Sequence, residues 1–465
     1  MTRIGRADRR PVVLRALFGI RRILPTAGHP ARSVISSFAA TVLIGTAVLM
    51  LPVAVETGRA TDLVTALFTA TSAVCITGLT VVDTTEHWST FGEITIIALI
   101  QIGGLGIMTV ASLLVLLVSR RFGLRMQLSA QRETKSIDLG EVRAVVFRVA
   151  LISFAVEIIV ATVFTIRLTT GYGESFGDAV YSGIFHGISA FNNAGFSLYT
   201  DSMSRFVSDP WISVALIVGV IVGGLGFPVV FELGRRLRGR IRWSMHTKIT
   251  LLTTAILLVV GFVYITLNEW RNPDTMGELG VGGKLLAGLF AATMPRSAGF
   301  HSVPIGEMES STLLVTDVLM FIGGGSASTA AGIKVTTFAL LAFVILAEIR
   351  GEPTVHVMGR RLAPEVQRQA LTVALLSVAL VMLTTITMLA VSDHRLDDVL
   401  FEAISAVGTV GLSTGITAEL RPEMHVVMSI LMFIGRLGPI TLATALALRD
   451  RPRRYELPEE RPIVG

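Results

Sequence analysis

Apolar runs of two lengths alternate with arginine-rich stretches along the chain, and the same order recurs four times. In each unit a long apolar run is followed by a short one, then by a turn that contains a glycine, then by a second long run. A helix needs about 20 apolar residues to cross a bilayer, so the long runs predict about eight crossings and the short runs predict re-entrant helices. We expect the four units at residues 34–119, 144–234, 247–348 and 369–448.

The unit boundaries also predict individual elements. The second unit is expected to end in a span at 211–233, and the fourth in a span at 426–448. Re-entrant helices are expected at 62–73, 176–189, 283–293 and 397–407. Acidic residues lie at or near the start of three of them, where carboxylates cap free backbone N–H groups: Asp62, Asp178 and Asp397.

Each short run ends in a turn where small or polar residues precede a glycine and a bulky apolar residue. Unpaired backbone is not tolerated in lipid, so such turns must face protein or water. Four turns at the same place in four units predict a ring around one water-filled path, where main-chain carbonyls replace the hydration shell of a cation. The candidate carbonyls belong to Ile76, Thr77, Gly78, Asn193, Ala194, Gly195, Ser297, Ala298, Gly299, Thr409, Val410 and Gly411. The alternative is that these glycines only allow helices to pack closely.

Composition places this pattern in a membrane. Of the 465 residues, 52% are hydrophobic and 16% are charged, against roughly 25% charged in soluble domains. The net charge is +6, and the basic loops all lie between units and never beside the glycine turns. Cytoplasmic loops are enriched in Lys and Arg, so we expect both termini in the cytoplasm and the turns open to the outside. Nucleic-acid binding is excluded because no aromatic and basic platform accompanies the charge.

The two ends of the chain are expected to lie on the cytoplasmic side. Residues 1–33 are basic, and Val12–Leu24 has apolar residues at helical spacing between arginines, which predicts an amphipathic helix on the inner membrane surface. A cleaved signal peptide is rejected because this segment has no uninterrupted apolar core. Residues 449–465 form a second basic, cytoplasmic tail.

A run of small and polar residues interrupts the last apolar stretch of the third unit. It predicts a helix break that faces protein or water at residues 323–332. The residues concerned are Gly323, Gly324, Gly325, Ser326, Ser328, Thr329, Gly332 and the following Lys334. The alternative is a tightly packed kink without a gating role.

Arg436 lies within the last apolar run, where a charge is costly and marks a pathway or a buried pair. We expect it to donate to carbonyls of the 323–332 loop; the alternative is an ion pair with Glu402. Arg296 is expected to brace the third turn through carbonyls of the re-entrant helix. His301 is expected to make the outer mouth pH-sensitive, and His186 to be a satisfied buried histidine.

Enzyme chemistry finds no support in the sequence. There is no Walker motif, no dinucleotide-binding glycine motif and no His/Glu spacing of a metalloprotease. No cluster of acid, base and nucleophile lies at membrane depth. Cys75, the single cysteine, excludes an intramolecular disulfide and is expected to be a small packing residue. No covalent cofactor is expected.

The turns at 72–79, 191–196 and 408–415 resemble those of the Trk/Ktr/HKT superfamily of cation transporters, most closely the Ktr membrane subunit. This resemblance implies an all-α integral membrane protein with four tandem span–pore helix–span units in one chain around a pseudo-fourfold pore. It implies potassium uptake, with residues 323–332 and Arg436 as the gate. It also implies a homodimer, regulated by a cytosolic nucleotide-binding ring of the RCK type. Glycine in all four turns is similar to the potassium-selective members, whereas Ala330 and Ala331 replace glycines often found in the family's gate loop.

Two questions stay open at this point. Potassium would be held by backbone carbonyls only. The role of sodium is open: it is a coupling or activating ion, or it is the transported ion if the chain is a sodium-conducting relative. The competing class is an alternating-access secondary transporter for another small solute, which also uses broken helices. Such transporters usually consist of two inverted repeats, and four parallel units argue against that class.

Overall fold

The computed structural model describes residues 30–122, 139–237, 239 and 243–438. Most of this part of the chain is helical, as the long apolar runs predict. The elements are α2 (Pro30–Leu49), α3 (Leu63–Val74), α4 (Thr84–His87), α5 (Thr90–Phe122), α6 (Leu139–Arg167), α7 (Phe176–Asn192), α8 (Pro210–Leu225), α9 (Phe227–Leu237), α10 (Met245–Asn268), α11 (Val281–Thr293), α12 (Ser310–Phe321), α13 (Val335–Ile349), β1 (His356–Val357), β2 (Arg360–Arg361), α14 (Pro364–Val391), α15 (Leu396–Gly408) and α16 (Pro422–Leu437).

Long apolar helices form the outside of the bundle. Within the described ranges, four helical stretches are long and apolar enough to cross a membrane, at 90–109, 144–172, 245–271 and 364–391. Their outward side chains are apolar and exposed, as at Ile158 (63%), Val259 (60%) and Leu383 (64%). Apolar exposure of this extent suits lipid rather than water. The protein is therefore a multi-pass membrane protein, while the eight crossings stay a prediction.

The four short helices are buried inside this shell. Helices α3, α7, α11 and α15 coincide with the predicted re-entrant segments to within three residues at each end. Their C-terminal halves are the most enclosed parts; in α15, for example, residues 401–408 are all buried. Helix α16 packs against α3 as well as α15, so the last unit of the chain lies beside the first.

The predicted capping acids are correct at one of three positions. Asp62 caps α3 by accepting a hydrogen bond from the Thr65 amide at 2.9 Å. Helix α7 is capped by Ser175 instead, and Asp178 lies in its first turn, where it accepts from the Ser175 hydroxyl at 2.7 Å. Asp397 lies in the first turn of α15 and is not its cap. All three carboxylates still lie at the positive end of a helix dipole.

The predicted span at 211–233 is broken in the structure. The chain breaks at Gly226 between α8 and α9, and the two helices meet at 104°. Gly226 has a φ of +90°, which favours glycine, and a Cβ there would lie 2.3 Å from the Ser326 carbonyl oxygen. The break therefore makes room for the 323–332 loop. In the first unit α2 ends at Leu49, and a 3₁₀ turn (Pro52–Ala54) follows.

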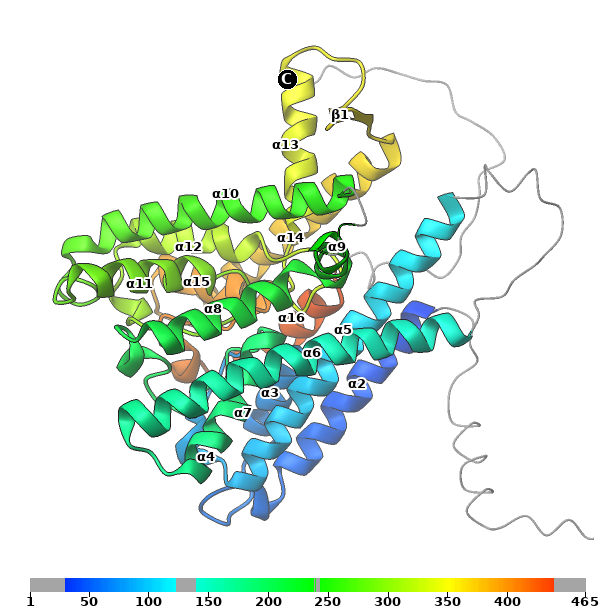
Figure 1. The fold of residues 1–465 in the computed structure, drawn as a ribbon. Helices are drawn as coiled ribbons and strands as arrows, with labels where there is room; N and C mark the ends of the chain where they lie inside the picture. Colours follow the sequence, from blue (N-terminus) through cyan, green and yellow to red (C-terminus); the bar gives the residue numbers. More distant parts are fainter. Residues whose placement is uncertain (1–29, 123–138, 238, 240–242, 439–465) are drawn as a thin grey trace, which may run out of the picture.

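Figure 1 shows α13 and the two-stranded hairpin β1–β2 standing away from the other helices, beyond α10. The hairpin pairs His356 with Arg361 and Val357 with Arg360. A separate small core that includes Ile249, Ala347 and Val357 holds this part together. It lies at the end of the third unit, in a region where the sequence predicts a cytoplasmic loop.

Some predictions fall outside the described residues. These are the amphipathic helix Val12–Leu24, most of the basic segment 1–33, the central part of the basic loop that follows the first unit, the end of the span 426–448 and the tail 449–465.

Candidate functional site

The four glycine turns meet one another in a closed ring. We call them the first (76–78), second (193–195), third (297–299) and fourth (409–411) turns. An added Cβ on each glycine would collide with a carbonyl oxygen of the next turn. These contacts are Gly78 to Ala194 O (2.3 Å), Gly195 to Ala298 O (2.7 Å), Gly299 to Val410 O (2.7 Å) and Gly411 to Thr77 O (2.1 Å). The order runs from the first turn to the fourth and returns to the first, so the ring has one member from each unit.

The backbone follows the same course in all four turns. In each, the glycine has a positive φ: +90° at Gly78, +74° at Gly195, +71° at Gly299 and +95° at Gly411. The residue two positions earlier also has a positive φ, although it carries a side chain: Ile76, Asn193, Ser297 and Thr409. Such conformations cost about 1–3 kcal/mol each and persist only where the surroundings enforce them. Four repeats of one strained conformation indicate a built site.

Three serines that sequence analysis did not single out hold these turns. Each lies six residues before a glycine, on the last turns of a short helix. The Ser72 hydroxyl accepts from the Gly78 amide at 3.0 Å and donates to the Leu79 carbonyl at 2.7 Å. Ser189 donates to the Phe196 carbonyl at 2.8 Å, and Ser405 accepts from the Gly411 amide at 3.1 Å. The signal was present in the sequence, because aligning the turns on their glycines also aligns these serines.

The third turn is built differently, through Ser297. Its hydroxyl donates to the Thr409 carbonyl at 3.0 Å and accepts from the Ala331 amide at 3.1 Å. One side chain thus joins the third turn to the fourth turn and to the 323–332 loop. The expectation for Arg296 is wrong in its partners: the guanidinium reaches Thr254 of α10 and the Gly323 carbonyl at 3.3–3.5 Å, not carbonyls of α11. It braces the loop as well as the turn.

The 323–332 loop interrupts the last apolar stretch of the third unit, between α12 and α13, as predicted. Its backbone pairs with the break after α8: the Gly325 amide donates to Gly224 O at 2.8 Å, and the Phe227 amide donates to Ala327 O at 3.1 Å. Its Thr329 hydroxyl lies 3.2 Å from the side-chain amide of Asn193 in the second turn. The loop therefore touches the turns and closes against α8 and α9.

Two further basic side chains bind the loop carbonyls. Arg436 of α16 donates to the Thr329 carbonyl, as the sequence predicts, and Lys334 donates to the Ala330 carbonyl. The alternative pairing of Arg436 with Glu402 does not occur, since Glu402 accepts from the Thr414 amide at 3.1 Å and from two hydroxyls. The Arg436 Nε and Nη2 atoms have no partner among the described residues. Positive charge is thus concentrated around the 323–332 loop.

The other three candidate residues are His186, Cys75 and His301, and none of them contributes an oxygen to the ring. His186 is fully buried, stacked between Phe164 and Tyr199, and both ring nitrogens have partners, as expected. Cys75 is fully buried, in agreement with a packing role. Burial lowers the pKa of His301 to about 4, although Asp201 nearby favours its charged form. His301 therefore stays neutral near neutral pH, which argues against the pH-sensitive mouth.

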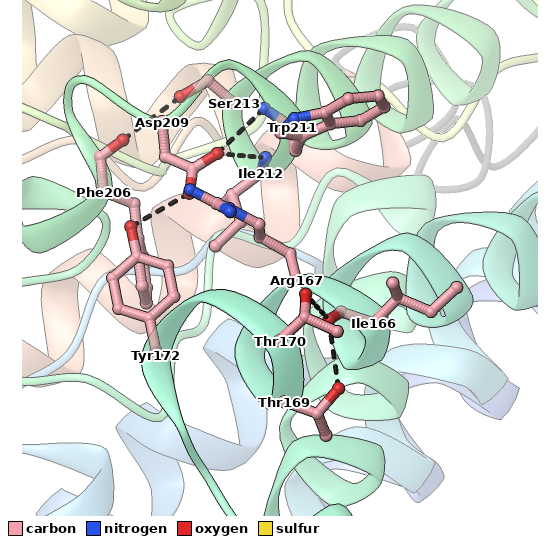
Figure 2. Close-up of polar contacts among 10 residues, drawn as sticks. All are labelled: Ile166, Arg167, Thr169, Thr170, Tyr172, Phe206, Asp209, Trp211, Ile212 and Ser213. Carbon is pink, nitrogen blue, oxygen red and sulfur yellow. Dashed lines mark hydrogen bonds and ion pairs between the residues drawn. The ribbon is translucent and has the colours of Figure 1, made fainter.

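A polar cluster joins the end of α6 to the start of α8 (Figure 2). Asp209 caps α8 by accepting from the Trp211 amide at 2.9 Å. It also accepts from Arg167 at 2.6 Å and from the Tyr172 hydroxyl at 3.0 Å, both at the end of α6. The cluster holds the two long helices that enclose α7.

The ring has the chemistry of a site for a hard monovalent cation. It presents carbonyl oxygens and no carboxylate. The hydroxyls of Thr77 and Thr409 are fully buried on the ring turns and have no hydrogen-bond partner in the described part of the chain. No group of three or more His, Cys, Asp or Glu side chains with metal-binding geometry occurs among the described residues. Such a donor set suits potassium or sodium as cargo.

Known proteins resemble this chain over nearly its whole length. The family model of the TrkH cation transport proteins matches residues 22–453. Ktr system potassium uptake protein B of Bacillus subtilis is 38% identical over 422 residues, 91% of this chain and 94% of that protein. The potassium/sodium uptake protein NtpJ of Enterococcus hirae is 32% identical over 445 residues, 94% of this chain and 97% of that protein.

The fold has a solved counterpart. The crystal structure of the potassium transporter TrkH from Vibrio parahaemolyticus superposes with a TM-score of 0.70, covering 89% of this chain and 85% of that one. Identity is 17%, so this likeness concerns the fold. The relatives are ion transporters and not enzymes. The chain belongs to the TrkH family of cation transport proteins.

Proposed function

We propose that this protein carries potassium into the cell through the ring of four glycine turns. One observation carries the proposal: each glycine packs against a carbonyl of the next turn, and the sequence of contacts closes on itself. A closed ring of carbonyls can replace the hydration shell of an ion that passes through it. The names of the relatives, potassium uptake and potassium/sodium uptake proteins, support the same cargo.

The ring follows from a fourfold architecture. In our proposal each unit is a span, a pore helix and a second span, at 34–119, 144–234, 247–348 and 369–448. The pore helices α3, α7, α11 and α15 direct their C-terminal ends toward the ring, where the negative end of each dipole favours a cation. The basic inter-unit loops then lie in the cytoplasm and the turns open outward.

The 323–332 loop is the proposed gate. It lies next to the second and third turns and is held by Arg296, Lys334 and Arg436. In this position the three positive charges would repel an entering cation, so the loop must move for ions to pass. A homodimer with a cytosolic nucleotide-binding ring would supply that control, and sodium would act as a coupling or activating ion.

Cation flux into liposomes that contain the purified protein tests the proposal. Potassium and rubidium should enter well ahead of sodium, and a large organic cation should not enter. A variant with residues 324–331 shortened serves as the open control, because it removes the need for a regulatory partner. Equal sodium and potassium flux through the shortened variant would contradict selectivity. No cation flux through it would contradict the pathway and favour a carrier for another solute.

A further inference from the structure

A carboxyl group lies buried behind the second turn without a basic partner. Glu157 is in the middle of α6, and only 4% of its surface is exposed. A carboxyl at such depth is costly unless it is paired, hydrogen-bonded or protonated. No ion pair with Lys, Arg or His involves it in the described part of the chain. The proposed function assigns this group no role.

The contacts of Glu157 are those of an ionised carboxylate. Gln101 Nε2 of α5 donates to both of its oxygens, at 3.0 and 3.2 Å. Asn192 Nδ2 of α7 donates to the Glu157 Oε1 atom at 3.4 Å. It also donates to the Gln101 Oε1 atom at 2.8 Å. A protonated carboxyl would need an acceptor for its own hydrogen, whereas each of these partners presents an N–H group. The amides of Gln101 and Asn192 are thereby oriented as donors.

This network lies directly against the ring. Asn192 is the last residue of α7 and precedes Asn193 of the second turn. The site is tightly packed, because a Cβ on Gly104 would lie 1.9 Å from Asn192 Oδ1. The nearest place where a cation is expected is the ring itself.

We infer that Glu157, presented through Gln101 and Asn192, is a positioning residue that supplies a fixed negative charge to the ion in the ring. The inference rests on the proposed function and deepens it: the carbonyl ring sets the size of the site, and Glu157 raises its affinity for a monovalent cation. Opposite charges about 10 Å apart, at an effective dielectric constant of about 20, interact by enough to change affinity about tenfold.

The test is Glu157→Gln, which keeps the shape of the side chain and removes the charge. We expect the apparent KM for rubidium uptake into liposomes to rise about tenfold. Potassium stabilises the folded protein by binding to it, so the rise in Tm of the purified protein with added potassium reports affinity independently of the gate. The potassium concentration needed for half of that rise should increase by the same factor.

Glu93→Gln is the matched control. Glu93 is also buried, bridges α5 and α7 by accepting from Tyr181 at 2.6 Å, and lies about three helical turns from the second turn. It should leave both readouts unchanged. Should Glu157→Gln fail to fold, Glu157→Asp and Glu157→Asn repeat the comparison at equal length, and only the Asp variant should keep the wild-type affinity to within about threefold.

The outcomes separate the two proposals. Wild-type affinity for potassium in the neutral variants overturns the role of Glu157 and leaves the carbonyl ring intact. Equal losses in Glu157→Asp and Glu157→Asn indicate a structural role and also overturn it. Absence of potassium-dependent stabilisation and of selective flux in the wild-type protein overturns the proposed function itself.

Discussion

Gly78 is the residue at which one added side chain tests the ring most directly. Gly78→Ser would place a Cβ 2.3 Å from Ala194 O, and its φ of +90° is unfavourable for serine. We expect the first and second turns to move apart and the preference for potassium over sodium to fall at least about tenfold, equivalent to about 1.4 kcal/mol. Flux of the two ions into liposomes, measured separately, gives the ratio.

Gly58→Ser is the control for backbone strain alone. Gly58 has a φ of +68°, but nothing lies within 4 Å of an added Cβ. It should lose some stability and keep wild-type selectivity. If Gly78→Ser also keeps wild-type selectivity, the four glycines serve only to let helices pack closely and do not form a filter.

Asp209 tests the polar cluster that joins the end of α6 to the start of α8. Burial by itself raises the pKa of Asp209, but hydrogen bonds from Arg167, Tyr172 and the amides of Trp211 and Ile212 outweigh it and lower the pKa. A carboxylate whose pKa is lower in the folded state than in the unfolded state stabilises the fold at pH values above the unfolded-state pKa, about 3.9. This stabilisation is lost as the pH falls through the pKa of the folded state.

We therefore expect Asp209→Asn to lose about 1–3 kcal/mol at pH 7, with a difference from wild type that shrinks as the pH falls below about 4. Thermal unfolding in detergent across this range measures it. Asp201→Asn is the control, because its ion pair with Arg205 is exposed and contributes little. A constant loss from pH 7 to pH 3 would show that the charge of Asp209 does not matter.

Single residues were predictable where the backbone required them. The four glycines could be found because no other residue adopts their conformation cheaply, and each recurs at the same place in the repeat. Arg436 was found because a charge in an apolar run is costly. The partners of Arg296 and the bridging role of Ser297 could not be found, since their contacts join segments far apart in the chain.

At the scale of elements, the break between α8 and α9 depends on the 323–332 loop. Gly226→Ala would bring a methyl group to 2.3 Å from Ser326 O, and the loop or the helices must shift. Overpacking of this kind costs about 1–3 kcal/mol. We expect a lower Tm and a displaced loop, seen as faster rubidium flux without any regulatory partner.

Gly239→Ala provides the comparison at a similar φ, +75°, with nothing within 4 Å of the new Cβ. Its flux should equal that of the wild type. Equal flux in Gly226→Ala despite a lower Tm would mean that the break is a structural bend with no connection to gating.

Arg436 connects α16 to the same loop. Arg436→Ala removes the hydrogen bond to the Thr329 carbonyl and one of the three positive charges that hold the loop. A charged hydrogen bond contributes about 1.5–3 kcal/mol, so the closed loop should become at least about tenfold less favoured. Rubidium flux without a partner should rise accordingly. Arg421→Ala, at the exposed start of α16, is the control, and unchanged flux in Arg436→Ala would refute the gate assignment.

The elements show what apolar periodicity can and cannot predict. The four short helices were located closely because an apolar run of a dozen residues is too short to cross the membrane. The loop between α12 and α13 was also predicted, because ten small and polar residues cannot continue an apolar helix. The break at Gly226 was missed, since the residues on both sides of it are apolar, and the break pairs with a loop that lies far away in the sequence.

At the scale of the whole molecule, the ring exists only when all four units are assembled. Each glycine turn is completed by a carbonyl from the next unit, and α16 closes the circle against α3. The repeat in the sequence predicts such a ring, but the order of contacts around it is set by packing between units. Partial folding would leave the turns with strained backbone and no compensating contacts, so we expect the units to unfold cooperatively.

The orientation of the assembly can be tested because Cys75 is buried and is the only cysteine. Cysteines introduced at exposed positions would be the only reactive thiols. Glu352→Cys lies between α13 and α14, on the predicted cytoplasmic side, and Asp274→Cys lies between α10 and α11, on the predicted outer side. In intact cells a membrane-impermeant thiol reagent should label Asp274→Cys and leave Glu352→Cys unlabelled until the membrane is opened. The reverse pattern would place the basic loops outside and turn the proposed direction of the pore around, while leaving the ring itself untouched.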